Sequence, residues 1–135
     1  MSMLMISKTP FRSSKYKAHK TIFDGITFDS KLEAFIYLML KEKQNHGEIA
    51  NLKRQVSVKL TDAKILLKID FSYKCPKTGD TVYYEVKGHQ TPVWRLKQRL
   101  WKHYGPAQLY VVGGSIDSQN RLKLKIIDHI IPAKS

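Results

Sequence analysis

Residues 65–87 read ILLKIDFSYKCPKTGDTVYYEVK, and the centre of the expected fold follows from this segment. Its two ends, Ile65 to Tyr73 and Thr81 to Lys87, are rich in β-branched and aromatic residues, which is typical of strands. Between them, Cys75-Pro76-Lys77-Thr78-Gly79-Asp80 has strong turn chemistry, because proline fixes φ and glycine accepts positive φ. The stretch therefore predicts an antiparallel hairpin.

The hairpin carries three residues of chemical interest. Asp70 lies between two apolar residues, where an unpaired acid would lower stability unless it has a partner. Glu85 and Lys87 are two apart in a strand and so point to the same face, while Val86 faces the other. Symmetric pairing about residue 78 would put Asp70 beside Val86, and a shift of one residue or a bulge would bring Asp70 and Glu85 together. Both registers remain open, as does the alternative that Glu85 and Lys87 are an exposed ion pair of little energetic weight.

A helix is expected before the hairpin. Ser30-Lys31-Leu32-Glu33 fits a capping box, and apolar residues follow at helical spacing until a stop near His46-Gly47. Glu33 lies at the border of the apolar stripe. It is either the capping partner of Ser30 or an acid that faces a cleft beside the sheet.

The remaining elements flank this core. Thr21 to Phe28 reads as a short hairpin with a turn at Asp24-Gly25, and Val56 to Leu60 alternates like a strand. A second helix is expected from Pro92 to about Tyr104. Gln108 to Val112 is expected to be a strand ended by Gly113-Gly114, and Leu122 to Ile127 a last strand or edge segment. The core order αβββαβ predicts an α/β fold with a central mixed β-sheet flanked by helices.

The second helix is amphipathic and basic. Its expected apolar face comprises Val93, Trp94, Leu96, Leu100, Trp101 and Tyr104. Lys97 falls near the middle of that face, so it either snorkels to solvent or meets an anion. Arg95, Arg99 and Lys102 fall on the opposite side. They are candidates for contacts with a DNA backbone, or alternatively form a solvated polar face.

Composition limits the class of protein. The chain has 135 residues with 42% hydrophobic content, which suits a single domain over 21–135. Lys and Arg total 24 against 11 Asp and Glu, a formal net charge of +13, and nucleic acid is the natural polyanionic partner. No apolar run approaches the ~20 residues that span a bilayer, so we expect a soluble, intracellular protein without a membrane partner.

Residues 1–20 form a separate segment by composition. They carry basic residues and no acid, which predicts a flexible basic arm. Its Lys15, Lys17 and Lys20 are candidates for gripping DNA, although a disordered, solvated tail fits the composition equally well.

The residue types favour oxygen ligands over sulfur or nitrogen. Cys75 is the only cysteine, and the five histidines are scattered, with no pair at ligand spacing. Two carboxylates can hold a hard divalent cation through oxygen. Such a cation activates water and neutralises charge on a phosphate, and a nearby lysine stabilises developing negative charge. The pattern favours phosphodiester hydrolysis.

Asp70 and Glu85-x-Lys87, with Glu33 on a preceding helix and a basic helix after them, resemble the PD-(D/E)XK nuclease superfamily. The resemblance is closer to phage and prophage endonucleases related to Holliday-junction resolvases. The segments that carry it are residues 15–18, 28–34, 69–71, 85–88 and 91–97. Ile69 stands where the name of the superfamily has proline.

This resemblance implies a restriction-endonuclease-like core and Mg²⁺-dependent cleavage of DNA, with Mn²⁺ as a substitute. It implies that Glu33, Asp70 and Glu85 bind the metal with help from the Val86 carbonyl, and that Lys87 is the catalytic lysine. The expected substrate is branched DNA, the expected assembly a homodimer, and the expected location the cytoplasm of a bacterial or phage-infected host cell. The alternatives are a sequence-selective or nicking duplex endonuclease, and a non-catalytic nucleic-acid-binding module.

Overall fold

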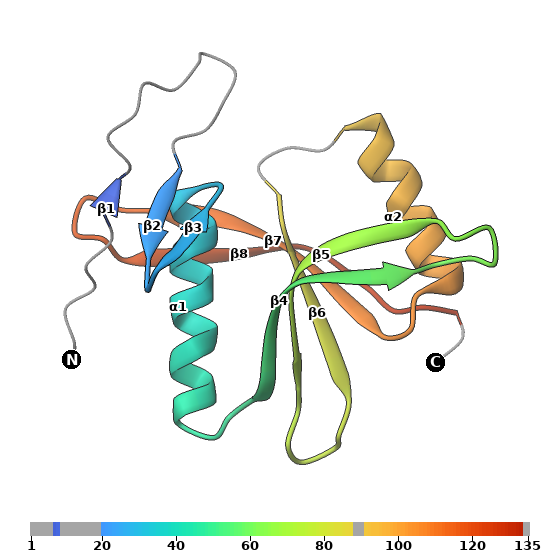
Figure 1. The fold of residues 1–135 in the computed structure, drawn as a ribbon, viewed down its shortest axis with the longest axis horizontal. Coiled ribbons are helices and arrows are strands. Elements are labelled where there is room, and N and C mark those ends of the chain that lie inside the picture. The colour runs from blue at the N-terminus through green and yellow to red at the C-terminus, as the bar shows by residue number, and fades with distance from the viewer. Residues whose placement is uncertain (1–6, 9–19, 88–90, 134–135) are drawn as a thin grey trace.

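The structure of the protein, a computed structural model, describes residues 7–8, 20–87 and 91–133. The elements of these residues are β1 (Ser7–Lys8), β2 (Thr21–Phe23), β3 (Ile26–Phe28), α1 (Lys31–Asn45), β4 (Ala50–Lys59), β5 (Leu66–Lys74), β6 (Thr81–Val86), α2 (Pro92–Tyr104), β7 (Gln108–Ile116) and β8 (Leu122–Ile130). Figure 1 shows α1 and α2 at opposite ends of the main sheet, with the N-terminal strands beside α1. Neither helix is long and apolar enough to cross a membrane among the residues described.

The main sheet is mixed. Its strand order is β4-β5-β6-β7-β8, and β6 and β7 are parallel while the other neighbours are antiparallel. The parallel pair needs a crossover, which contains α2. The predicted α/β class, the mixed sheet and the two flanking helices are thus confirmed.

The elements before the sheet form where the sequence predicts them. Asp24 and Gly25 have φ of 57° and 73°, so the turn between β2 and β3 uses two left-handed residues, as tight hairpins prefer. Ser30 caps α1, its Oγ accepting the backbone N–H of Glu33 at 3.1 Å. In the N-terminal arm, the described part of residues 1–20 includes β1, which pairs with β2.

Several strand boundaries differ from the prediction, and the start of β4 and the end of β7 differ most. β4 begins at Ala50 rather than at Val56, with an irregular register between Ala50 and Lys53. β7 does not end at Gly113-Gly114 but continues to Ile116. The glycines lie inside the strand because β8 approaches closely there: a Cβ at Gly114 would collide with the Lys123 carbonyl oxygen, and Gly114 has φ of 140°.

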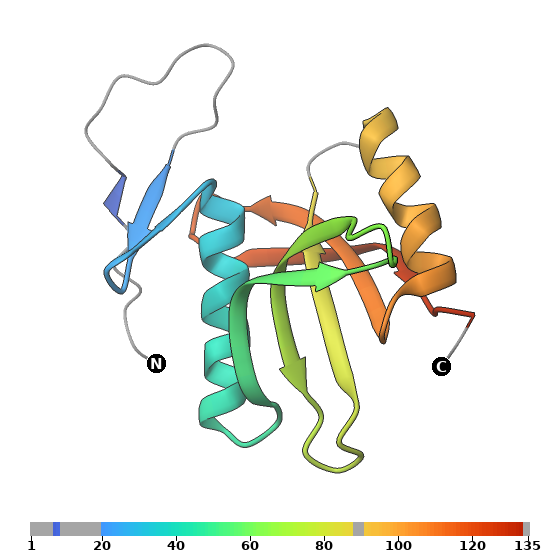
Figure 2. The same ribbon diagram turned by 45° about the vertical axis from the view of Figure 1, so that its right-hand side comes forward.

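The interior consists of two hydrophobic clusters, and β5 contributes to both. Phe71 packs in the cluster beneath α1, whereas Leu67 and Ile69 pack in the cluster with Trp94 and Trp101 of α2. The two strands β4 and β5 therefore lean toward α1 at one end and toward α2 at the other. Figure 2 shows the β4–β5 hairpin curving across toward α2.

Only part of the predicted apolar face of α2 is buried. Trp94 and Trp101 are 3% and 0% exposed and Leu100 packs beside them, but Val93 and Leu96 are 64% and 51% exposed. Tyr104, also predicted on this face, is exposed as well. The predicted apolar face is buried only in part because the helix packs along the narrow edge that carries its two tryptophans.

Candidate active site

A row of polar residues crosses three strands of the main sheet. The pairs Arg54–Phe71 and Val56–Ile69 flank Gln55 and Asp70, so these two residues lie opposite each other on β4 and β5. The last pair between β5 and β6 is Phe71–Tyr84, and the next position along brings Asp70 opposite Glu85. The pairing is one residue away from symmetry about residue 78, and the shift brings the two acids together.

Where the backbone hydrogen bonds between β5 and β6 end, the carboxylates of Asp70 and Glu85 accept hydrogen bonds from backbone N–H groups instead. The Val86 N–H donates to Asp70 Oδ2 at 2.9 Å, and the Asp70 N–H donates to Glu85 Oε1 at 3.1 Å. Each side chain thus satisfies a backbone group of the other strand that would lose its partner as β5 turns away. The junction between the two strands therefore fixes both carboxylates.

Lys87 is held at the same junction from two sides. Its Nζ lies 3.3 Å from Glu85 Oε2 and 4.5 Å from the centre of the Trp94 ring. The Glu85 side chain is only 8% exposed, against 28% for Lys87. The alternative that this is an exposed surface pair is therefore wrong: the carboxylate is buried, and the ammonium lies between an anion and an aromatic face.

Glu33 reaches the junction from α1. It is 5% exposed, and its Oε2 accepts the Gln55 side-chain amide at 3.4 Å. The same amide donates to Asp70 Oδ1 at 3.4 Å. Capping accounts for the backbone N–H of Glu33, which Ser30 accepts, while the carboxylate faces the strands. We refer to Glu33, Asp70 and Glu85 as the carboxylate cluster.

Gln55 is a member of the site that the sequence analysis did not identify. The alternation of Val56 to Leu60 would assign it to the polar, outward face along with Ser57 and Lys59. In the structure Gln55 has φ of 52°, in the left-handed region, which interrupts the alternation of β4. Glutamine has no marked preference for that region, so no local signal in the sequence predicted a left-handed residue at this position of β4.

The electrostatics of the carboxylate cluster disfavour three negative charges. Burial, with the charges of Asp70 and Asp29 added, raises the pKa of Glu33 to about 7 despite the opposing effect of Arg54. Burial and Asp70 raise the pKa of Glu85, and Lys87 only partly offsets them. Burial also raises the pKa of Asp70, against the hydrogen bond from Val86. A cation at the cluster would relieve this repulsion.

The donor set fits a hard divalent cation by its chemistry. All three acids offer carboxylate oxygen, the ligand type of Mg²⁺, and all three are held at one junction. Among the residues described, however, no three His, Cys, Asp or Glu side chains converge as a ready-made metal site. Gln55 donates to both Glu33 and Asp70, and Lys87 contacts Glu85, so these side chains would have to move for a cation to bind all three acids.

The other predicted site residues are distributed unevenly. Lys97 lines a cavity together with Glu85 and Lys87, so it belongs near the site. Arg95, Arg99 and Lys102 instead line a larger cavity of about 690 Å³ between α2 and β8, which includes no member of the carboxylate cluster. The prediction that they contact DNA stays a prediction.

Of the predicted arm residues, Lys20 forms an ion pair just before α1, and the others lie outside the described residues. Lys20 Nζ lies 3.7 Å from Asp29 on the neighbouring turn. Lys15 and Lys17 lie outside the described residues. For Val86, the structure shows its N–H bound to Asp70, and the role of its carbonyl as a ligand stays a prediction.

The fold and the site together define an α/β protein with buried carboxylates and a lysine at a splayed strand junction. A family model described as "Protein of unknown function (DUF1064)" matches residues 13–112, and the chain belongs to this family. The match includes the whole carboxylate cluster, Gln55 and Lys87. No curated protein and no solved structure matches the chain.

Proposed function

We propose that the protein is a metal-dependent DNA endonuclease of the PD-(D/E)XK type, with a restriction-endonuclease-like core. The observation that carries the proposal is the junction itself: Asp70 and Glu85 bound across β5 and β6, with Lys87 at 3.3 Å from Glu85. A structural ion pair would not need Glu33 and Gln55 brought to it from two further elements. Glu33 and Glu85 are buried and Asp70 is half-buried. Raised pKa values at three such neighbouring acids are typical of a functional site.

In this proposal Glu33, Asp70 and Glu85 hold Mg²⁺ or Mn²⁺, with the Val86 carbonyl as a further ligand. When bound, the ion neutralises charge on the scissile phosphate and lowers the pKa of water. Lys87 donates hydrogen bonds to the attacking water and to a phosphate oxygen, stabilising the negative charge that develops in the transition state. Trp94 fixes the direction of the Lys87 ammonium, since its ring lies against it.

The substrate class follows from charge and from the family resemblance. A net charge of +13 suits a polyanion, because phosphate contacts gain from the release of counterions. We propose branched DNA, such as a four-way junction, as the preferred substrate. Cutting two strands of a symmetric junction suits a homodimer with two identical sites.

The test is cleavage of a panel consisting of a four-way junction, a linear duplex and a single strand, each with Mg²⁺ and with EDTA. Preferential, Mg²⁺-dependent cleavage of the junction is the expected result. Asp70→Ala should abolish cleavage and retain binding. If Asp70→Ala still cleaves the junction, the carboxylate cluster is not the site of cleavage.

The same panel separates the alternatives. Preference for one linear sequence over the junction would indicate a duplex endonuclease with the same centre. Binding of DNA without cleavage, together with failure of Mg²⁺ and Mn²⁺ to bind, would indicate a non-catalytic module. Sedimentation of the free protein and of its junction complex tests the homodimer.

A further inference from the structure

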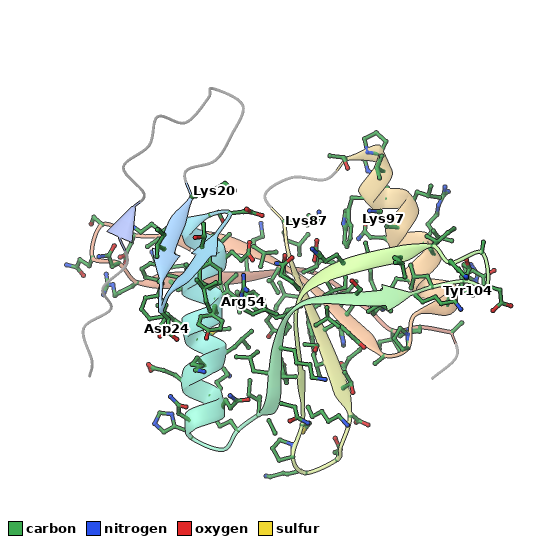
Figure 3. The ribbon with its side chains drawn as sticks, in the orientation of Figure 1. Lys20, Asp24, Arg54, Lys87, Lys97 and Tyr104 are labelled. Carbon is green, nitrogen blue, oxygen red and sulfur yellow. The ribbon has the colours of Figure 1, made fainter. Side chains whose placement is uncertain are left out.

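A small cavity lies beside the carboxylate cluster, between β5 and α2. Its volume is about 230 Å³, and its walls include Lys68 of β5, Lys87 at the end of β6, and Lys97 of α2. Figure 3 shows Lys87 and Lys97 on neighbouring elements that face the same region of the molecule. The cavity shares Glu85 and Lys87 with the proposed centre, so any group inside it is next to the reacting bond.

The charged residues in the wall of this cavity are mostly positive. Among the residues described, Glu85 is the sole acid in its wall, and that carboxylate is already engaged by Lys87 and the Asp70 N–H. Lys68 and Lys97 form no ion pair with any acid in the described part of the chain. Lys97 is half-buried and Lys68 is exposed. Such a pair favours an anion.

The size of the cavity indicates what kind of anion enters it. Pockets for whole small molecules measure roughly 300–1,000 Å³. At about 230 Å³, this cavity is too small for a complete ligand of that kind and suits one segment of a larger molecule. A backbone phosphate with its sugar is such a segment.

We propose that Lys68 and Lys97 form a subsite for the backbone phosphate adjacent to the one that is hydrolysed. This inference rests on the proposed function, because it takes the carboxylate cluster as the place of hydrolysis. It assigns Lys97 to an anion rather than to solvent, and it adds Lys68 as a contact from the opposite wall.

The first experiment measures binding without metal. A four-way junction and a linear duplex of matching sequence are titrated in EDTA over a range of salt, with wild type, Lys68→Ala, Lys97→Ala and Lys77→Ala. Lys77 is a matched control, an exposed lysine in the turn at the other end of the β5–β6 hairpin. Each phosphate contact contributes about 0.9 to the slope of log K against log salt.

Loss of Lys68 or of Lys97 should therefore lower that slope by about one, and loss of Lys77 should leave it unchanged. Lys97→Arg, which keeps the charge, should retain the slope. It is also the control that keeps the proposal testable if Lys97→Ala fails to fold. If the two alanine variants behave like Lys77→Ala, the subsite is wrong. Inorganic phosphate is the second probe: competition with DNA at low millimolar concentration would overturn the assignment to a polymer segment.

The second experiment locates the phosphate. Single methylphosphonates, which lack the charge, are placed at each phosphate near the mapped cut. Neutralising one neighbouring phosphate should slow cleavage by wild type and have no further effect on Lys97→Ala. Effects that add at every position would overturn the proposal.

The two experiments keep the subsite and the centre distinguishable. If wild type does not cleave with Mg²⁺ yet both lysine variants lower the salt slope, the proposed hydrolysis fails and these lysines still bind phosphate. If wild type cleaves and the lysine variants match Lys77→Ala in both assays, the centre stands and the subsite fails.

Discussion

Asp117 and the carboxylate cluster lie in opposite electrostatic surroundings. Asp117, in the loop between β7 and β8, accepts the backbone N–H groups of Gln119 and Arg121 at 2.9 Å each and the Arg121 Nε at 2.8 Å. These donors, the Arg121 backbone first, hold the pKa of Asp117 below its usual range. In the carboxylate cluster, burial raises the pKa of every member.

The two sites differ in how far the protein's own donors and cations compensate the negative charge. In the loop the chain itself provides enough donors, so Asp117 is a satisfied anion with a local structural role. At the strand junction, Lys87, Arg54 and a few hydrogen bonds offset the charge of three acids, of which Glu33 and Glu85 are buried and Asp70 is half-buried. An arrangement that leaves charge uncompensated in the free protein is expected where an external cation completes it.

The largest effect is expected when one acid of the carboxylate cluster is neutralised and Asp117 is neutralised for comparison. Glu85→Gln should reduce the rate of junction cleavage by at least ~10²-fold, the effect of losing one charge-stabilising group in a catalytic site. Asp117→Asn should leave the rate within about twofold of wild type. Single-turnover cleavage of a labelled four-way junction in Mg²⁺ measures both.

Equal rates for Glu85→Gln and Asp117→Asn would remove the functional distinction between the two groups. Melting curves of both variants are the control for folding, because Glu85 also accepts the Asp70 N–H. Glutamine retains that acceptor, so a large loss of rate with a small change in Tm assigns the effect to charge.

Metal binding gives the next effect. If the carboxylate cluster binds Mg²⁺, the ion at about 100 times its Kd should stabilise the folded protein by about 2.7 kcal/mol. For a chain of this size that is a rise in Tm of roughly 5–15 °C. Differential scanning fluorimetry with and without MgCl₂ at pH 8 measures the rise, with K⁺ at equal ionic strength as the control.

The same titration on variants tests where the ion binds. Asp70→Asn should remove most of the rise in Tm, and Asp117→Asn should keep it. A rise that survives in Asp70→Asn places the ion elsewhere on the protein.

A third prediction uses pH in the metal-free protein. The pKa of Glu33 is about 7 in the folded state against 4.5 for the unconstrained side chain, so the folded state holds more protons between these values. Stability is therefore lost as pH rises from about 4.5 through about 7. In EDTA, the Tm of wild type minus that of Glu33→Gln should fall by several degrees over this range and level off above it.

Asp117 should give the opposite sign. Its folded pKa lies below 3.8, so its contribution to stability is present above that value and is lost as pH falls further. The Tm of wild type minus that of Asp117→Asn should therefore rise with pH in the acid range. A Glu33 difference that rose with pH would contradict the raised pKa and weaken the contrast between the two groups.

The sequence was sufficient for the elements and for most of the site because these depend on local patterns. Alternation, turn chemistry and capping predicted the hairpins and both helices, and spacing by two placed Glu85 and Lys87 on one face. The register of Asp70 against Glu85 could not be predicted, because a shift of one residue satisfies the same turn. It is fixed by the packing of Phe71 beside Tyr84 in the cluster under α1.

The parts that failed depend on contacts between distant segments. Gly113 and Gly114 look like a strand end but permit the close approach of β8. Val93 and Leu96 match a buried helical face, yet the elements that cover α2 reach only its tryptophan edge. Gln55 depends on a single left-handed residue inside β4, which has no counterpart in the alternation of the sequence.

Gln55 accordingly gives the last and smallest prediction. Its amide donates to both Glu33 and Asp70, and this hydrogen bond opposes the rise in the pKa of Asp70. Replacing it with an isosteric apolar residue, Gln55→Leu, should slow cleavage about tenfold, which corresponds to ~1.4 kcal/mol and to the loss of one hydrogen bond to a charged group. The pH at which cleavage is half-maximal should move upward, since Asp70 would ionise less readily. Gln98 is the matched control, because its Nε2 donates to Asp128 at 3.3 Å in a comparable contact outside the site. Gln98→Leu should change neither the rate nor the pH profile. A Gln55→Leu variant with an unmoved pH profile would mean that Gln55 only shapes β4, and that the carboxylate cluster is positioned by the strands alone.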